Sequence, residues 1–322
     1  MKAKEDIIIN GRSLKDILNL HELFLISNEK EGERANLEGV NLEDVNLEGV
    51  NLKRANLTDV NLKRANLKYA NLTDANLKCA CLYNACLIGA CLYNACLINA
   101  NLEDANLGEA NLEGANLIGA CLEDANLCNA NLYNTYLKDV NLEGANLRYA
   151  NLKDANLYNT CLKDANLYNA NLEDTNLEGA NLEGSYLIGA NLFRAKLVEA
   201  KLDNVTYDHT TLFYALQCPE KGNFIAYKKA GKCIVELEIL ENSKRSSATT
   251  RKCRCDKARV ISIENIETGE KVIEVSSNRD KNFTYKVGKV VSVDDFNEDR
   301  WVECTTGIHF FMTKHEAESY DV

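Results

Sequence analysis

Cysteine and histidine residues in the last third of the sequence are of types that could bind a metal or act in catalysis. Cys253 and Cys255 are separated by one residue, and Cys304, His309 and His315 add further soft ligands. Paired zinc cysteines are usually two to four residues apart, and no second pair is present. For a nucleophilic Cys304 with His309 as its base, no acid that would orient the histidine is identifiable. We therefore expect no metal, no cofactor and no catalytic residue, with Cys304 packed in the interior.

A basic segment at residues 244–254 has the composition of an anion site. It combines guanidinium groups, hydroxyls and backbone N–H groups in what we expect to be one loop. The candidate anion ligands are Arg245, Ser246, Ser247, Thr249, Thr250, Arg251, Lys252 and Arg254. There is no glycine-rich P-loop, and an ordinary solvated basic loop is the alternative interpretation.

The composition is that of a globular protein. The chain has 322 residues, 46% of them apolar, a formal charge of −11, thirteen cysteines and a single proline. It has no apolar run long enough to span a membrane and no export signal, so we expect a cytoplasmic protein with reduced thiols. Its negative charge disfavours general binding to nucleic acid.

A five-residue period dominates the chain. From Leu37 to Leu202 every fifth residue is leucine, which makes 34 consecutive units, and a small residue stands two positions before each leucine. In a helix, five residues advance about 500°, which would spread the leucines over every face. In a straight strand, an odd period would send successive leucines to opposite faces. The chain must therefore bend once in every unit, as in a solenoid.

The repeated units, such as Ala-Asn-Leu-Glu-Gly at 35–39 and Ala-Asn-Leu-Lys-Tyr at 65–69, resemble those of the pentapeptide-repeat proteins. The resemblance implies an all-β solenoid, a right-handed quadrilateral β-helix with four repeats per coil and about nine coils. Leucine and the small residue would point inward and the other three positions outward. The best-known activity in that family is an acidic rod that imitates DNA and binds a type II topoisomerase.

Both ends of such a rod need a cover, because unpaired strand edges and an exposed leucine floor invite aggregation. A capping-box-like start at Ser13 predicts an amphipathic helix over about 14–28, whose Leu14, Ile17, Leu18, Phe24 and Leu25 would sit on the first coil. The predicted organisation is therefore an N-terminal capping helix segment at 1–34, the β-helix at 35–212 and a C-terminal domain at 213–322.

Residues twenty apart would stack in columns on the outside of the rod. One column gathers carboxylates that could face a basic partner, namely Glu103, Asp104, Glu123, Asp124 and Glu143. Residues 35–212 hold 13 basic and 23 acidic residues, but basic residues between Lys53 and Lys78 oppose a DNA-mimic interpretation. One coil also carries an apolar girdle that could bury against a partner or a second copy of the chain, made of Tyr83, Ile88, Tyr93 and Ile98.

Cysteine replaces asparagine at positions 81, 86, 91 and 96, and again at 121 and 161. The four in one turn would lie on four different faces, so their sulfurs cannot converge on a metal. Cys81, Cys121 and Cys161 share a column but would lie about 10 Å apart, beyond disulfide reach. We interpret all six as spacers that fit the asparagine position.

Residues 213–322 lose the repeat and read as a small β-rich or α+β domain. Apolar runs at 232–239, 258–263, 271–275 and 287–293 predict strands, residues 267–270 a turn, and 314–318 a short helix after Thr313. The segments 244–254 and 301–311 resemble a domain of unknown function found at the C-terminal ends of bacterial and phage pentapeptide-repeat proteins.

These features together predict a non-enzymatic scaffold that presents a rigid β-helical rod to a protein partner, with no membrane contact and no direct contact of the rod with nucleic acid. The first alternative is an acidic DNA mimic that binds a type II topoisomerase. A C-terminal module that binds an anion or nucleotide is the third interpretation. A homodimer through the girdle remains an open alternative.

Overall fold

The structure is a computed structural model that describes residue 2 and residues 4–320. It divides into two compact units, Met1–Leu212 and Phe213–Val322, which are described separately. No helix in the described part of the chain has both the length and the apolar character needed to cross a membrane.

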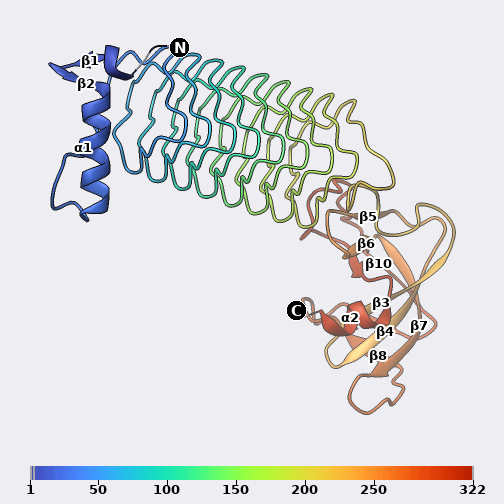
Figure 1. Cartoon of the computed structure of the whole chain (residues 1–322). Coiled ribbons are helices and arrows are strands. Elements are labelled where there is room, and N and C mark those ends of the chain that lie inside the picture. The colour runs from blue at the N-terminus through green and yellow to red at the C-terminus, as the bar shows by residue number, and fades with distance from the viewer. Residues whose placement is uncertain (1, 3, 321–322) are drawn as a thin grey trace. The chain divides into compact units, whose positions relative to one another are not determined.

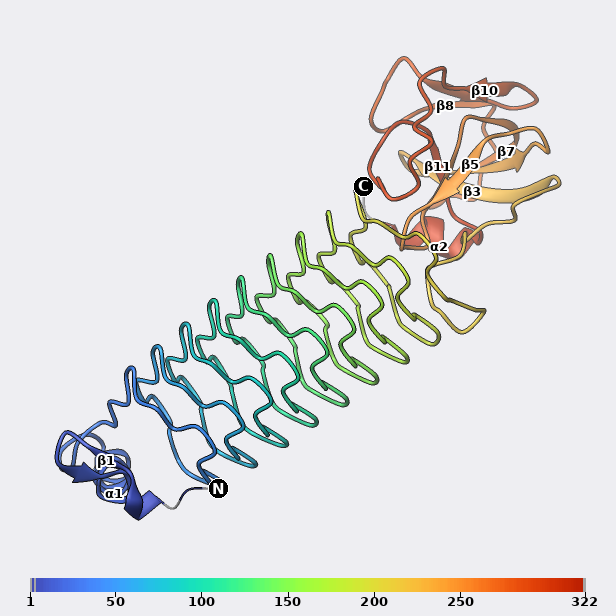
Figure 2. The same cartoon turned by 90° about the horizontal axis from the view of Figure 1, so that it is seen from above.

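The repeat forms a stack of coils in which each coil takes 20 residues (Figures 1 and 2). Parallel bridges join residues 20 apart, as in Asn36 with Asn56 and Asn56 with Asn76, and four such ladders run along the stack. Leu37 N donates to Asn56 O at 2.8 Å, and Asn56 N donates to Ala35 O at 3.0 Å. Each unit therefore contributes one short rung of a parallel β-helix, which confirms the solenoid predicted from the repeat and the four repeats per coil that the resemblance implies.

A tight turn in every unit explains why the period is five. The N–H of Val40 donates to the carbonyl of Leu37 at 3.2 Å, and Gly39, the third of the four residues of that turn, has a φ of +66°. A positive φ at this position alone is the signature of a type II turn, which favours glycine, asparagine or aspartate. Asp44 occupies the corresponding position of the next unit with a φ of +61°. Because the turn recurs in each unit, every leucine can point into the interior of the coil.

The leucines and the small residues form the core of the stack. Every period leucine from Leu37 to Leu197 is at most 1% exposed, whereas the last, Leu202, is half-buried. Where threonine replaces alanine, its hydroxyl donates to the carbonyl of a leucine in the preceding coil, as Thr160 does to Leu137 at 2.6 Å. Ser185 fills the same kind of position, but its hydroxyl has no partner among the described residues.

The asparagines before the leucines hold neighbouring coils together, and from Asn51 onward they are half-buried. Asn36 Oδ1 accepts from the N–H of Glu38 in its own unit at 3.3 Å and from Asn56 Nδ2 in the next coil at 2.9 Å. One side chain thus closes a local turn and extends a ladder along the stack. This position is therefore part of the frame and not of the free outer surface.

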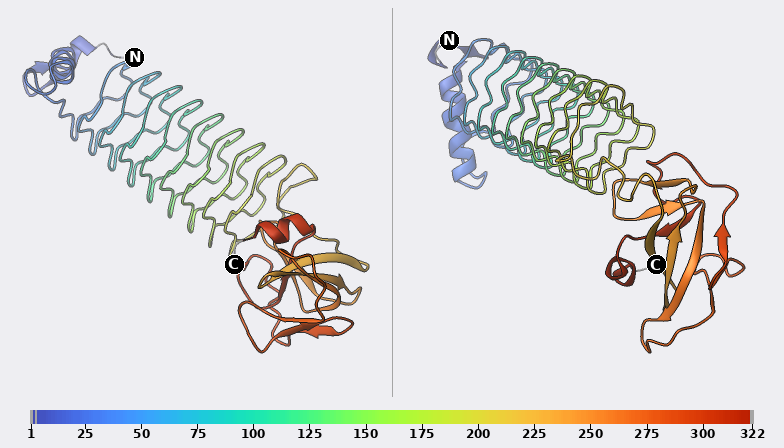
Figure 3. Two further views of the ribbon diagram at one scale, coloured as in Figure 1. Left: turned by 90° about the horizontal axis from the view of Figure 1, so that it is seen from below. Right: turned by 90° about the vertical axis from the view of Figure 1, so that its right-hand side faces the viewer.

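The N-terminal end of the stack is covered by a helix, α1 (Leu14–Ile26), which lies across the first coil (Figures 1 and 3). It follows a short 3-10 helix, η1 (Lys4–Asp6), and a hairpin of β1 (Ile8–Ile9) and β2 (Arg12–Ser13). The hairpin turns at Asn10-Gly11, both with positive φ, and Ser13 caps the helix by accepting from Asp16 N at 3.1 Å.

The sequence predicted this helix but not all of the residues that seat it. Leu14 is fully buried, whereas the other four predicted contacts, Ile17, Leu18, Phe24 and Leu25, are half-buried. The second buried residue is His21, whose Nδ1 accepts from the N–H of Ala35, the first inward residue of the rod, at 3.1 Å. Burial lowers the pKa of His21, which favours the neutral ring that this bond requires.

The C-terminal unit is built on small antiparallel sheets. Its four-stranded sheet has the order β10 (Val290–Ser292), β7 (Lys257–Asn265), β4 (Cys233–Ile239), β3 (Phe224–Ala230). Its three-stranded sheet has the order β11 (Ile308–Phe310), β6 (Cys253–Cys255), β5 (Arg245–Ser247). β8 (Glu274–Ser276) pairs with β9 (Thr284–Lys286), and α2 (Lys314–Ser319) begins with a capping box at Thr313.

Strand predictions for this unit succeeded where the apolar runs were long. Residues 232–239 and 258–263 lie in β4 and β7, the runs at 271–275 and 287–293 reach only the short strands β8 and β10, and the helix predicted after Thr313 is α2. The prediction that 244–254 forms one loop was wrong, because β5 and β6 occupy its two ends and pair with each other. Ser246, Ser247, Lys252 and Arg254 are buried as a result.

Candidate functional site

The arginines of the predicted anion site serve the fold of the C-terminal unit. All five guanidinium N–H donors of Arg245 point at backbone carbonyls, those of Ser243, Pro219, Gly222, Leu240 and Glu241. Arg254, 2% exposed, donates to the carbonyls of Val302, Asn297 and Asp299. Arg245 has no guanidinium N–H left for an anion, and Arg254 keeps only a buried Nε without a partner among the described residues, so the structure assigns both arginines to the fold and not to an open anion site.

The other residues of that prediction also fail to converge. The side chain of Ser247 accepts from Gln217 N, Thr250 donates to the Glu303 carboxylate, and Arg251 pairs with Glu316 at 3.3 Å. Ser246 and Thr249 are buried. Successive side chains of β5 alternate between the faces of the sheet, and Thr249, Thr250 and Arg251 lie in the connection between β5 and β6. Of the eight residues, only Lys252 lines the pocket described next.

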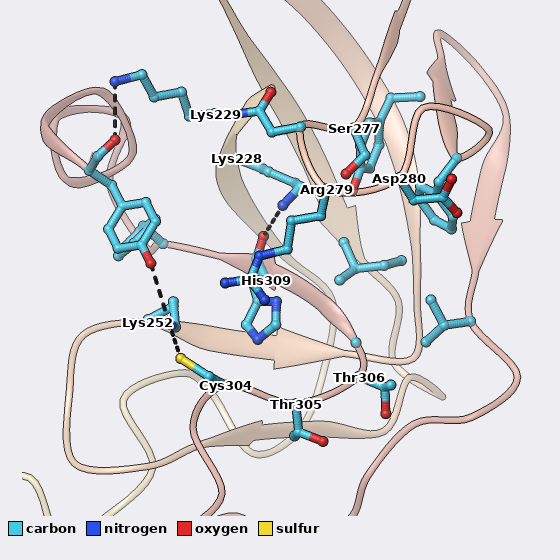
Figure 4. A pocket seen from close by; sticks show the side chains of 18 of the residues that line it. Lys228, Lys229, Lys252, Ser277, Arg279, Asp280, Cys304, Thr305, Thr306 and His309 are labelled. Carbon is cyan, nitrogen blue, oxygen red and sulfur yellow. Dashed lines mark hydrogen bonds between the residues drawn. The ribbon is translucent and has the colours of Figure 1, made fainter. Parts of the chain in front are cut away.

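A pocket of about 480 Å³ opens in the C-terminal unit (Figure 4). Several separate segments line it. β3 contributes Lys228 and Lys229, the segment before β6 contributes Lys252, the loop after β8 contributes residues 277–280, and residues 304–309 come from the end of the loop before β11 and from β11 itself. Apolar rings, including those of Phe283 and Tyr285, form part of the wall. Its size lies within the range typical of small-molecule sites.

Cationic side chains dominate the polar lining. Lys228 Nζ donates to the carbonyl of His309 at 3.3 Å, and burial, reinforced by the nearby charge of Arg279, lowers the pKa of Lys228 to about 8. Arg279 has no hydrogen bond or ion pair with any residue that the structure describes. Figure 4 shows Lys228, Arg279 and His309 gathered in the middle of the pocket. The site thus presents positive charge to whatever enters it.

Lys252 and Cys304 lie together on one side of this pocket. Lys252 Nζ lies 3.5 Å from Cys304 Sγ, 3.4 Å from the Tyr320 hydroxyl and 3.8 Å from a Glu303 carboxylate oxygen. Burial alone would lower the pKa of Lys252, but the charge of Glu303 and the neighbouring thiol outweigh it, so the pKa is raised. The ammonium therefore stays charged at neutral pH.

His309 is a neutral member of the site. Burial, with the charges of Lys228 and Lys252, lowers its pKa to about 4, and its Nε2 lies 3.4 Å from the Glu303 carbonyl. The Cys304 thiol contacts Lys252, whereas the His309 ring contacts the Glu303 carbonyl. Cys304 and His309 therefore do not form a thiol–imidazole pair. The prediction that Cys304 is packed in the interior was wrong, because its side chain is exposed.

The carboxylates predicted as a partner face do form a continuous column on the rod. Bridges join position 101 to 121 and 121 to 141, so Glu103, Glu123 and Glu143 stack, each with an acidic residue or a glycine beside it. A cation bounds the column at one end, where Lys163 Nζ lies 3.2 Å from Glu143 Oε1. At the other end the Tyr83 hydroxyl bonds to Asp104, which raises the pKa of that tyrosine.

The predicted girdle is only partly open to solvent. Tyr93 is 39% exposed, whereas Tyr83, Ile88 and Ile98 are half-buried by the outward side chains of neighbouring coils. All thirteen cysteines lie within the described residues as free thiols, and the six in asparagine positions occupy the same ladder sites as the asparagines they replace. Among residues 2 and 4–320, no group of three or more potential ligands is placed to hold a metal ion.

Comparison with solved structures gives similar β-helical proteins. HetL, a pentapeptide-repeat protein involved in heterocyst differentiation regulation from the cyanobacterium Nostoc sp. strain PCC 7120, is 31% identical over 57% of this chain and 92% of its own, with a TM-score of 0.29. Rfr23 from the cyanobacterium Cyanothece 51142 is 35% identical over 36% of this chain and 88% of its own, with a TM-score of 0.28. QnrB1, a plasmid-mediated fluoroquinolone resistance protein, is 16% identical over 54% and 90%, with a TM-score of 0.36.

Family models account for most of the sequence. The model of pentapeptide repeats (8 copies) matches residues 33–65, 55–92, 95–134, 135–174 and 170–206. A family of unknown function, DUF5758, matches residues 214–317. No curated protein matches the chain. The chain therefore belongs to the pentapeptide-repeat family, and its C-terminal unit is a DUF5758 domain.

Proposed function

We propose that this chain is a non-enzymatic scaffold whose β-helix presents columns of side chains to a protein partner. Pentapeptide-repeat proteins are typically non-catalytic. The observation that carries the proposal is that different positions of each unit serve the core and the outer surface. Leucine, the small residue and asparagine hold the coils together, so the two turn residues are free to vary and to form a surface.

The carboxylate column is the surface best suited to a basic partner. Glu103, Glu123 and Glu143 lie on successive coils of a backbone with little freedom to rearrange, so their charges are held at fixed spacing. Fixed like charges attract a complementary surface over a distance set by ionic screening. Binding through this column should therefore weaken as salt is added.

Charge-neutral variants test the column. In the triple variant Glu103→Gln, Glu123→Gln and Glu143→Gln, the loss of three charges should weaken partner binding at least tenfold while the fold persists. The matched control is Glu38→Gln, Glu48→Gln and Glu178→Gln, because these glutamates are outward residues that lie off the column. Equal loss of binding in both triples would refute the assignment of the partner face.

The same column favours a second candidate, a DNA mimic that binds a type II topoisomerase. Residues 35–212 carry a net charge of −10, as the imitation of a duplex requires. One observation opposes the DNA-mimic candidate. Arg64 bonds to Asp44 on the same face of the rod as the carboxylate column, nearer the N-terminus, so this face carries both positive and negative charge. A gyrase supercoiling assay separates the two candidates, since a DNA mimic inhibits supercoiling or protects the enzyme, and a scaffold for another protein does neither.

The girdle supports a homodimer as a further form of the scaffold. Tyr93 is its most accessible member. If two copies meet there, Tyr93→Ser should shift the mass measured by light scattering from dimer to monomer, and the control Tyr136→Ser on another part of the rod should leave it unchanged. A monomeric wild-type chain would rule out this form.

A further inference from the structure

We propose that the pocket of the DUF5758 unit binds a small organic anion, with its carboxylate or phosphate group held by Arg279 and Lys228 and its apolar body against Phe283 and Tyr285. The proposal is independent of the partner of the β-helix. It replaces the anion site expected at residues 244–254, where the guanidinium groups are occupied by backbone carbonyls.

The first argument is charge balance within the lining. Four cations, Lys228, Lys229, Lys252 and Arg279, face two carboxylates, Asp280 and Asp295. The lining therefore has a net charge of about +2 when all six groups are ionised. A partly enclosed cavity of one sign focuses its field on the space inside and raises the local concentration of anions.

The second argument is which cations are free to bind. Lys229 donates to the carbonyls of Glu318 and Tyr320, both at 3.0 Å, and so fixes the end of α2. Lys252 has the contacts with Cys304, Tyr320 and Glu303 given above. Lys228 bonds only to a neutral carbonyl, and the Arg279 guanidinium has no partner in the described part of the chain. These two groups retain the donors that an oxyanion would use.

The third argument is the shape and character of the walls. The pocket is far larger than an inorganic anion requires, and Phe283, Tyr285 and Phe311 supply apolar surface beside the charged groups. Lys228 Nζ lies 5.9 Å from the centre of the Tyr285 ring, so charge and ring face the same space. A ligand with one anionic end and an apolar body satisfies both parts of the lining.

The exposed thiol of Cys304 gives a direct test, because it lines the pocket. Its sulfur can be alkylated by iodoacetate, which is anionic, or by iodoacetamide, which is neutral. In each reaction the thiol proton passes to solvent, a carbon–sulfur bond forms and iodide leaves. Cys79, an exposed thiol on the rod, is the internal control. Peptide mass spectrometry of the full chain measures both rates in one sample.

We expect the iodoacetate-to-iodoacetamide rate ratio at Cys304 to exceed that at Cys79 by about tenfold, the lower end of electrostatic focusing. Arg279→Gln should reduce the ratio at Cys304 severalfold. Arg259→Gln should leave it unchanged, since Arg259 pairs with Glu238 outside the pocket lining. Both arginines are exposed or half-exposed, so neither variant should fail to fold, and circular dichroism checks this.

Protection of the same thiol identifies the ligand class. Phenyl phosphate or benzoate should slow the reaction of Cys304 with iodoacetamide, whereas their neutral analogues phenol and benzamide should not. Stronger protection by phenyl phosphate assigns a phosphate ligand, and stronger protection by benzoate assigns a carboxylate. Equal alkylation ratios at Cys304 and Cys79, no protection by either anion, or equal protection by neutral and charged probes would each overturn the proposal.

Discussion

Two buried hydroxyls in the rod should have opposite effects on stability. Thr160 and Ser185 occupy the same inward position of their units, and both are fully buried. Thr160 Oγ1 donates to the carbonyl of Leu137 at 2.6 Å, whereas the Ser185 hydroxyl has no partner among the described residues. The first hydroxyl therefore recovers a hydrogen bond after leaving water, and the second loses its hydration without replacement.

The size of each effect follows from these contacts. Burial of a hydroxyl without a partner costs about 1–3 kcal/mol, so Ser185→Ala should stabilise the rod by roughly 1 kcal/mol, the lower end of that range. Thr160→Val keeps the shape but removes the donor, which should destabilise the rod by about 1 kcal/mol. The carbonyl of Leu137 would retain only the long bond from Val140 N, at 3.4 Å.

Thermal unfolding followed by far-ultraviolet circular dichroism measures both changes. For a unit of this size, 1 kcal/mol corresponds to about 2–4 °C, so the melting temperatures of the two variants should move apart by roughly twice that. Ala180→Ser serves as the control, because it places a new hydroxyl at another inward position. A lower melting temperature for Ser185→Ala than for the wild type would show that the reasoning from hydrogen-bond satisfaction fails here.

Three further perturbations test other parts of the structure. Leu117→Asp should cost several kcal/mol because it buries a carboxylate in the leucine stack, whereas Glu113→Asp on the surface should change the melting temperature little; equal melts would contradict the inward assignment. Gly49→Ala and Gly114→Ala should each cost about 1 kcal/mol because both glycines have positive φ, +64° and +67°, and the exposed Asn94 side chain near Gly114 can move aside; equal melting temperatures of either variant and the wild type would contradict this. His309 has a pKa of about 4 in the folded state against about 6.5 when unfolded, so the unfolded state binds more protons between these values and stability falls as the pH drops through them, by at most about 3–4 kcal/mol. Fluorescence of the single tryptophan, which lies in the same unit, should show that His309→Asn loses this pH dependence.

The rod could be predicted from sequence because its determinants are local and repeated. Leu37 and the residues around it specify one turn and one inward contact, and the same sequence pattern recurs 33 more times. The end of the rod was harder to read. Nothing in the local sequence marks His21 as buried, because its partner, the N–H of Ala35, lies 14 residues further along the chain.

The C-terminal site could not be predicted in the same way. Its lining comes from segments near 228, 252, 279 and 309, which antiparallel pairing and one bridge between Tyr227 and Phe311 bring together. The strands β5, β6 and β11 have three residues each, which is too short for an alternation of apolar and polar residues to identify a strand. Lys252 was among the predicted anion ligands, but its predicted companions Arg245 and Arg254 bond to backbone carbonyls.

The 20-residue coil makes the outer surface sensitive to the length of the chain in units of five. Deletion of one repeat between Asp104 and Glu123 would leave every downstream leucine inward but rotate the rest of the stack by a quarter turn. The carboxylate column would then be divided between two neighbouring sides, while the core and its hydrogen bonds would be preserved. Loss of a whole coil would only shorten the rod. Such a chain can therefore change what it displays by gaining or losing single repeats, without any change in how it folds.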